Sequence, residues 1–162
     1  MQIPSDLDPA LIPLAFLIGS WSGSGVGAGD LPFTQRLEIA VVPGHPVLSH
    51  VSTATAADGS VAAEVGFWRV GEGLTDVELL VVDGAGFAEV SYGTVSGYRV
   101  ELGSDAVLRS ATGVAVSAIR RLYGRLEADL AYAVDRAVGG GRLAAHASAR
   151  LHPITDPDVN PA

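Results

Sequence analysis

Glycine and proline divide this chain into many short apolar segments, and that division most constrains how it can fold. The 162 residues include 20 glycines and 9 prolines, which are spread along the chain instead of being gathered in one linker. Many links between segments are very short, as in Asp58-Gly59 and Asp83-Gly84. Short links join antiparallel neighbours, whereas parallel strands need a crossover of about a dozen residues or more. The pattern is therefore typical of an all-β sandwich or barrel.

About ten antiparallel strands following one short helix favour an up-and-down barrel, because closure removes the exposed edges of an open sheet. The helix is expected within Asp8–Ile18, where Asp8 can cap the start and Pro9 suits the first turn. It would cover one side or one mouth of the barrel. The segments with a strand signal are residues 20–27, 34–42, 47–55, 61–70, 76–82, 87–93, 97–102, 106–112, 114–122, 125–135 and 142–151.

The length predicts one domain, which we assign to residues 1–152, followed by a flexible Pro- and Asp-rich tail at 153–162. Hydrophobic residues make up 48% and charged residues 17%, which is the reverse of a disordered chain. The net charge of -8 argues against binding to nucleic acid, because phosphate backbones repel an acidic surface. With no cysteine in the chain, histidine is the softest metal ligand available.

No segment is predicted to cross or enter a membrane. The most apolar early stretch, Leu11–Ile18, is far shorter than the roughly 20 residues that a spanning helix needs. No basic residue precedes Arg36, so the charged start of a secretory signal is missing. We therefore expect a soluble, cytoplasmic protein, and alanine-rich strand faces that could mediate a homodimer.

A series of four glycines, interrupted by one tryptophan, marks the first predicted strand. Gly19, Trp21, Gly23, Gly25 and Gly27 stand at every second position and so share one face of a strand. The four glycines have no Cβ atoms on this face, so a ligand could lie flat against the backbone there. Alternatively, the series is a sharply bent barrel strand that packs on the helix with the tryptophan in the core. The spacing alone does not decide between these readings.

Histidine is the other candidate for chemistry, and the chain has His45, His50, His146 and His152. The neighbours of His146 are small, which leaves room for a planar ligand. Strict alternation, however, places His146 on the same face as Arg142 and Arg150, so periodicity does not identify a site. No metal-chelating pair, P-loop or nucleophile elbow is present, and the carboxylates are scattered singly, so no acid–base pair can be chosen.

Three motifs resemble the nitrobindin family of haem-binding β-barrels, and the resemblance covers most of the chain. Residues 14–27 (LAFLIGSWSGSGVG) match the family's GxWxGxGxG signature at all five positions. Residues 64–69 (EVGFWR) resemble its E-x-G-[YF]-x-R strand, and 146–152 (HASARLH) resemble its H-x₄-L-H pattern. The chain departs from the family at 28–35 (AGDLPFTQ), which stands for [KR]-Y-P-T-I, and at Asp83-Gly84, which replaces His-Pro.

This resemblance implies a ten-stranded barrel that holds one haem b at a mouth. It makes His146 the axial iron ligand and the residue that carries catalysis. It places the series from Gly19 to Gly27, with Trp21, along the wall of the haem site, and it offers Thr34 as the threonine near the haem. Family members hold ferric haem, bind nitric oxide and are assigned the isomerisation of peroxynitrite to nitrate. His50 could be a distal or supporting group.

Two other functions remain open at this stage. The barrel could carry a lipophilic ligand such as a fatty acid, with Arg69, Arg99 or Arg120 clamping its carboxylate. Alternatively, it could be a degenerate haem barrel that keeps the fold without iron.

Overall fold

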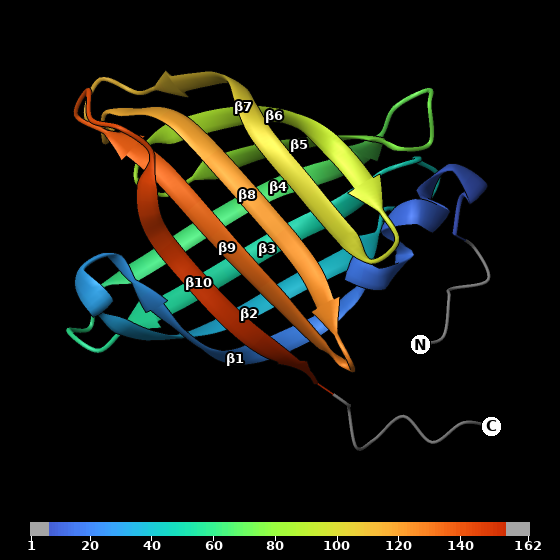
Figure 1. The fold of residues 1–162 in the computed structure, drawn as a ribbon, viewed down its shortest axis with the longest axis horizontal. Helices are drawn as coiled ribbons and strands as arrows, with labels where there is room; N and C mark the ends of the chain where they lie inside the picture. The colour runs from blue at the N-terminus through green and yellow to red at the C-terminus, as the bar shows by residue number, and fades with distance from the viewer. Residues whose placement is uncertain (1–6, 155–162) are drawn as a thin grey trace.

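Ten antiparallel strands pair in chain order, and the first also pairs with the last, so the sheet closes into a barrel (Figure 1). This computed structural model describes residues 7–154. The predicted up-and-down barrel is thereby confirmed. The strands are β1 Gly19–Gly27, β2 Pro32–Val41, β3 Leu48–Ala56, β4 Val61–Val70, β5 Asp76–Asp83, β6 Phe87–Ser96, β7 Arg99–Arg109, β8 Val116–Leu126, β9 Asp129–Val138 and β10 Ala144–Pro153.

The sequence predicted one strand segment too many, between residues 97 and 112. Segments 97–102 and 106–112 form the single strand β7, which continues through Gly103 and accommodates Asp105 as an extra residue opposite β6. A β-bulge of this kind breaks the alternation of inward and outward residues, which imitates a strand end in the sequence.

A second difference concerns residues 125–135, predicted as one strand. Arg125 and Leu126 end β8, and β9 begins only at Asp129. The turn between them places Glu127 at φ +58°, a conformation that glycine or asparagine usually marks in a sequence. Because position 127 holds a glutamate, the sequence did not indicate a turn between β8 and β9. Of the predicted tail, Pro153 belongs to β10 and residues 155–162 lie outside the described residues.

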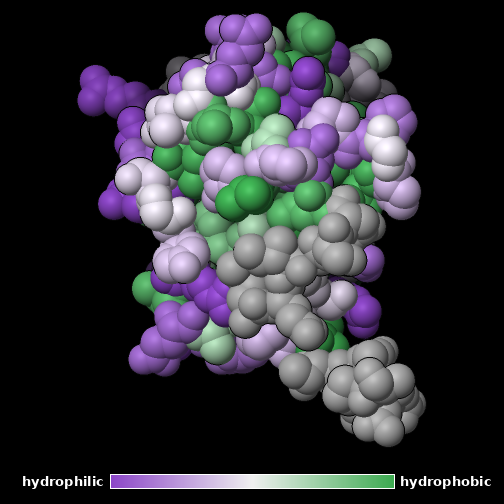
Figure 2. Space-filling model, turned by 90° about the vertical axis from the view of Figure 1, so that its right-hand side faces the viewer, coloured by the Kyte–Doolittle hydropathy of each residue, from purple (hydrophilic) through white to green (hydrophobic). Residues whose placement is uncertain are grey.

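The predicted helix near the N-terminus is the 3₁₀ helix η1, Pro9–Leu17, and it lies across one end of the barrel (Figure 1). The Asp8 side chain accepts a hydrogen bond from the Ala10 amide at 2.9 Å, which confirms the expected cap. Leu11, Leu14 and Phe16 are among the buried residues of η1. Figure 2 views this end of the molecule, where hydrophobic side chains gather toward the middle and hydrophilic ones toward the borders.

The main hydrophobic core fills the half of the barrel that η1 covers. Trp68, Leu79 and Val100 are at its centre, and each is fully buried. A smaller cluster around Phe87 and Ile119 lies toward the other end. Among the described residues, no helix combines the length and apolar character needed to cross a bilayer.

The glycine series of β1 is explained mainly by close packing of protein against protein. A Cβ on Gly23 would lie 2.3 Å from the carbonyl oxygen of Arg150, and one on Gly25 would lie 2.3 Å from that of Ser148. The Trp21 ring packs against Gly19, and its Nε1 donates to the Leu17 carbonyl at 3.0 Å. These residues therefore allow β1 to bend closely against β10 and dock η1, as the second of the two sequence interpretations proposed.

A Gly25→Ala substitution tests this close packing. The new methyl group would meet the Ser148 carbonyl and the Phe33 ring, so we expect a loss of about 1–3 kcal/mol in the free energy of unfolding. Gly103→Ala is the matched control, because a Cβ there meets nothing within 4 Å, and its effect should stay within about 0.5 kcal/mol. Urea denaturation measures both, and equal effects would contradict the packing explanation.

Candidate functional site

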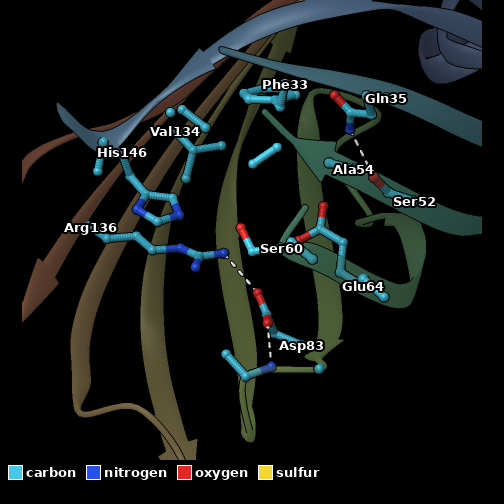
Figure 3. A pocket seen from close by; sticks show the side chains of 18 of the residues that line it. Phe33, Gln35, Ser52, Ala54, Ser60, Glu64, Asp83, Val134, Arg136 and His146 are labelled. Carbon is cyan, nitrogen blue, oxygen red and sulfur yellow. Dashed lines mark hydrogen bonds and ion pairs between the residues drawn. The ribbon is translucent and has the colours of Figure 1, made fainter. Parts of the chain in front are cut away.

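A cavity of about 420 Å³ lies inside the barrel at the end away from η1 (Figure 3). Its walls come from β1 to β5 on one side and from β8 to β10 on the other. The volume falls within the range of roughly 300–1,000 Å³ typical of small-molecule sites. The barrel thus has a filled end and a hollow end.

The walls of the cavity are unusually bare. Nine of the lining residues among those described are glycine or alanine, and they occur on opposite sides of the space. Small side chains leave the backbone accessible, so a broad flat ligand can approach both walls closely. These residues are Gly27, Ala28, Ala54, Ala56, Ala62, Ala63, Gly84, Ala85 and Ala147.

His146 points into this cavity from β10, and a β-bulge is what turns it inward (Figure 3). Ala145 pairs with Asp135 and Ala147 pairs with Val134, so His146 is the extra residue between two successive pairs. The bulge places His146 and Ala147, which are adjacent in sequence, both on the cavity wall. Strict alternation, which placed His146 on the same face as Arg142 and Arg150, therefore does not hold at this position.

The imidazole of His146 is half-buried, and neither ring nitrogen has a hydrogen-bond partner among residues 7–154. Burial, followed by the positive charge of Arg136, lowers the pKa of His146 below 6.5. The ring is therefore neutral at pH 7, and a neutral imidazole is the form that binds a metal. In the described part of the chain, no cluster of three or more His, Asp or Glu side chains could hold a metal ion. A single histidine ligand suits a metal that arrives with its other ligands already attached.

A buried arginine forms the floor of the cavity. Arg121 of β8 is 1% exposed, and its Nη1 and Nη2 donate to the two oxygens of Glu64 at 3.1 and 2.9 Å. Its Nε and Nη2 donate to Glu89 at 3.1 and 2.8 Å. Nη1 also donates to the Tyr123 hydroxyl. Carboxylates that are scattered singly in the sequence therefore converge on one guanidinium across the barrel, which the sequence did not reveal.

His50 supports this network from the core side and does not line the cavity. Trp68 Nε1 donates to His50 Nδ1 at 3.2 Å, so the proton of the neutral ring is on Nε2, which donates to Glu64 at 3.0 Å. Burial alone would raise the pKa of Glu64, but the charge of Arg121 and the hydrogen bond from His50 hold that pKa well below 4.5. Glu64, whose side chain is 15% exposed, is thus an anion fixed in place at the floor of the cavity.

Two further polar contacts cross the barrel at the level of the cavity. Arg136 Nη2 of β9 forms an ion pair with Asp83 Oδ2 of β5 at 2.8 Å (Figure 3). The Tyr132 hydroxyl donates to Gln35 Oε1, while Gln35 Nε2 donates to the Ser52 hydroxyl at 2.8 Å. The cavity is therefore apolar on its walls and polar at selected points of its floor and sides.

Of the residues that the sequence nominated, the structure brings His146 and Gly27 to the cavity. Gly19 and Trp21 lie at the filled end, in contact with each other. Thr34 is exposed on the outer side of β2, and the residues of this segment that line the cavity are Phe33 and Gln35.

The arginines considered for a carboxylate clamp, Arg69, Arg99 and Arg120, are all exposed. The arginines that line the cavity are instead Arg121 and Arg136. Arg121 follows Arg120 directly on β8. Because successive residues of a strand point to opposite faces, Arg120 lies on the outer surface and Arg121 inside the barrel. In the Arg120-Arg121-Leu122 segment, alternation with the inward Ile119 and Tyr123 could have indicated which arginine faces inward.

Comparison with known proteins gives a consistent family. Residues 10–152 match the family described as "THAP4-like, heme-binding beta-barrel domain". A peroxynitrite isomerase of Parafrankia sp. (strain EAN1pec) is 42% identical, over 91% of this chain and 81% of that protein. A ferric nitrobindin-like protein of Nocardia farcinica is 39% identical, over 93% of this chain and 70% of that protein. The crystal structure of Rv2717c from M. tuberculosis superimposes with a TM-score of 0.82 at 31% identity, covering 93% of this chain and 100% of that one.

Replacing Arg121 by methionine tests the floor of the cavity. Two carboxylates would then lie buried without their cation, and we expect the free energy of unfolding to fall by about 3–5 kcal/mol. Arg120→Met is the matched control, since it removes the same charge one residue away at an exposed position, and it should change stability by no more than about 0.5 kcal/mol. Chemical denaturation at pH 7 measures both. Similar stabilities for the two variants would contradict the assigned role of Arg121.

Proposed function

Because this chain belongs to the nitrobindin family of haem-binding β-barrels, we propose that it binds one haem b in the cavity, with His146 as the axial ligand. The observation that supports this most directly is the bulge at His146. It turns a neutral imidazole without a hydrogen-bond partner among the described residues into a space whose walls are mainly small and apolar.

The cavity has the features that a haem requires. A porphyrin supplies four nitrogen ligands of its own, so a single histidine completes the coordination from the protein. The glycine and alanine residues on opposite walls, with Gly27 among them, leave space for a flat macrocycle. Gly23 and Gly25 contribute indirectly, because they let β1 lie close to β10, the strand that carries His146.

We propose further that the haem is ferric and that the protein isomerises peroxynitrite to nitrate, as the names of similar proteins suggest. Ferric haem would supply a Lewis-acidic iron that can bind an anion. Peroxynitrite and nitrate have the same composition and charge, so the overall reaction needs no proton to be gained or lost. The chain's own part is to hold the cofactor through His146 and to surround the reacting anion with apolar walls such as Phe33 and Val134. Nitric oxide is the second small ligand that we propose for the bound haem.

The carrier function is less well supported. Its expected clamps, Arg69, Arg99 and Arg120, are exposed, so they cannot hold a carboxylate inside the barrel. The degenerate barrel without iron gives no reason for the β-bulge that turns His146 into the cavity. Both alternatives predict that hemin produces no histidine-ligated spectrum.

Hemin titration tests the proposal. The wild-type protein should bind hemin with a Soret band of a histidine-ligated ferric haem. His146→Ala should lose that spectrum. Its affinity for hemin should fall by more than about 100-fold, because mutating a residue that only supports a metal ligand typically costs about 10–100-fold. His152→Ala is the matched control, because His152 lies on the same strand but is exposed and bonded to Asp129. If wild-type protein shows no saturable Soret band, or if His146→Ala retains the wild-type spectrum, the proposal is wrong.

A further inference from the structure

Arg136 differs from the other interior arginine in having donors to spare. Its side chain is 12% exposed and lines the cavity beside His146 (Figure 3). The guanidinium lies over the Phe87 ring, with Cζ 5.0 Å from the ring centroid, and Nη2 donates to Asp83. Its Nε is buried and has no acceptor among the described residues. Arg121, in contrast, directs Nε and both terminal nitrogens at acceptors.

An unpaired buried donor is a rare feature of a folded protein and is unfavourable. Here it belongs to a cation fixed at two points, by the Asp83 carboxylate and by the aromatic ring beneath it. A guanidinium held in this way presents its remaining N–H groups in a fixed direction, which suits the oxygens of a carboxylate or another planar oxyanion. Asp83 engages Nη2, and Nε is closed off from the cavity. Nη1 is not closed off in this way and has no acceptor among the described residues, so an oxygen of a ligand in the cavity can approach the guanidinium at Nη1.

We propose that Arg136 binds an anionic oxygen group in the cavity and that Asp83 positions it for this role. Two sources have the required chemistry. One is a propionate of the bound porphyrin, and this source rests on the proposed function. The other is a small inorganic oxyanion such as nitrate, which is also the product of the proposed reaction. Neither source depends on a contact between Arg136 and iron.

Metal-free protoporphyrin IX and its dimethyl ester separate the first source from the proposed axial ligand. Neither compound can be bound through iron, and only the first has free carboxylates. We expect Arg136→Gln to weaken protoporphyrin IX binding about tenfold or more in fluorescence titrations, because a charge-assisted hydrogen bond is lost, and to leave the ester unchanged. Arg142→Gln is the matched control, since it removes an exposed positive charge close to the start of β10. Asp83→Asn should produce a smaller loss in the same direction, and thermal denaturation checks that each variant is folded.

Calorimetric titration with sodium nitrate separates the second source. If a small oxyanion is the ligand, Arg136→Gln weakens nitrate binding and leaves the affinities for both porphyrins unchanged. If neither porphyrin nor nitrate binding differs between wild type and Arg136→Gln, the proposal is overturned. A wild-type protein that binds nitrate through Arg136 but takes up no hemin would refute the proposed function and retain this site. If wild type and Arg136→Gln bind hemin equally well and do not differ in nitrate binding, the proposed function is retained and the site at Arg136 is refuted.

Discussion

The contact of Arg121 with two glutamates is the interaction on which the arrangement of the barrel interior depends. Glu64 comes from β4, Glu89 from β6 and Arg121 from β8, so three strands that are not neighbours are joined through the middle of the barrel. A buried cation needs partners on every side, because burial removes the water that would otherwise solvate it. The network therefore fixes the distance between opposite walls at one level of the barrel and separates the filled end from the hollow end.

The two ends follow from which residues point inward on each side of that level. Toward η1 the inward positions hold large residues such as Trp68 and Leu79, and these pack against the underside of the helix. Toward the other end many of the inward positions hold alanine, serine or glycine, which cannot fill the same cross-section. A barrel whose wall is held apart by a rigid ionic floor cannot collapse onto small side chains, so a cavity remains.

Much of the fold could be predicted from the sequence, because strands with short links and alternating residues allow few architectures. The position of η1 and its cap also followed from local signals at Asp8 and Pro9. The errors arose where the pattern depends on three dimensions. The bulges at Asp105 and His146 change the phase of a strand without any local marker, and the turn at Glu127 uses a non-glycine residue at positive φ.

The candidate site was only partly predictable for the same reason. His146 could be nominated through a family motif, but its inward orientation depends on the pairing of β10 with β9. The convergence of Glu64 and Glu89 on Arg121 links residues far apart in the chain, and no spacing rule connects them. The glycine spacing in β1 indicated that something packs closely against the backbone. It did not indicate whether that is a neighbouring strand or a ligand, since both require the absence of a Cβ.

The charges inside the barrel bear on which oxidation state the proposed cofactor would have. Glu64, Glu89 and Asp83 contribute three formal negative charges, and Arg121 and Arg136 contribute two positive ones, while burial keeps His146 neutral. The interior therefore has a formal charge of -1. A ferric porphyrin core has a formal charge of +1 and a ferrous one has none, so this charge of the interior would favour the oxidised form of the proposed cofactor. In a medium of low dielectric constant such a compensation is stronger than it would be in water, so the same ionic floor that keeps the cavity open would also stabilise the ferric state of a bound haem.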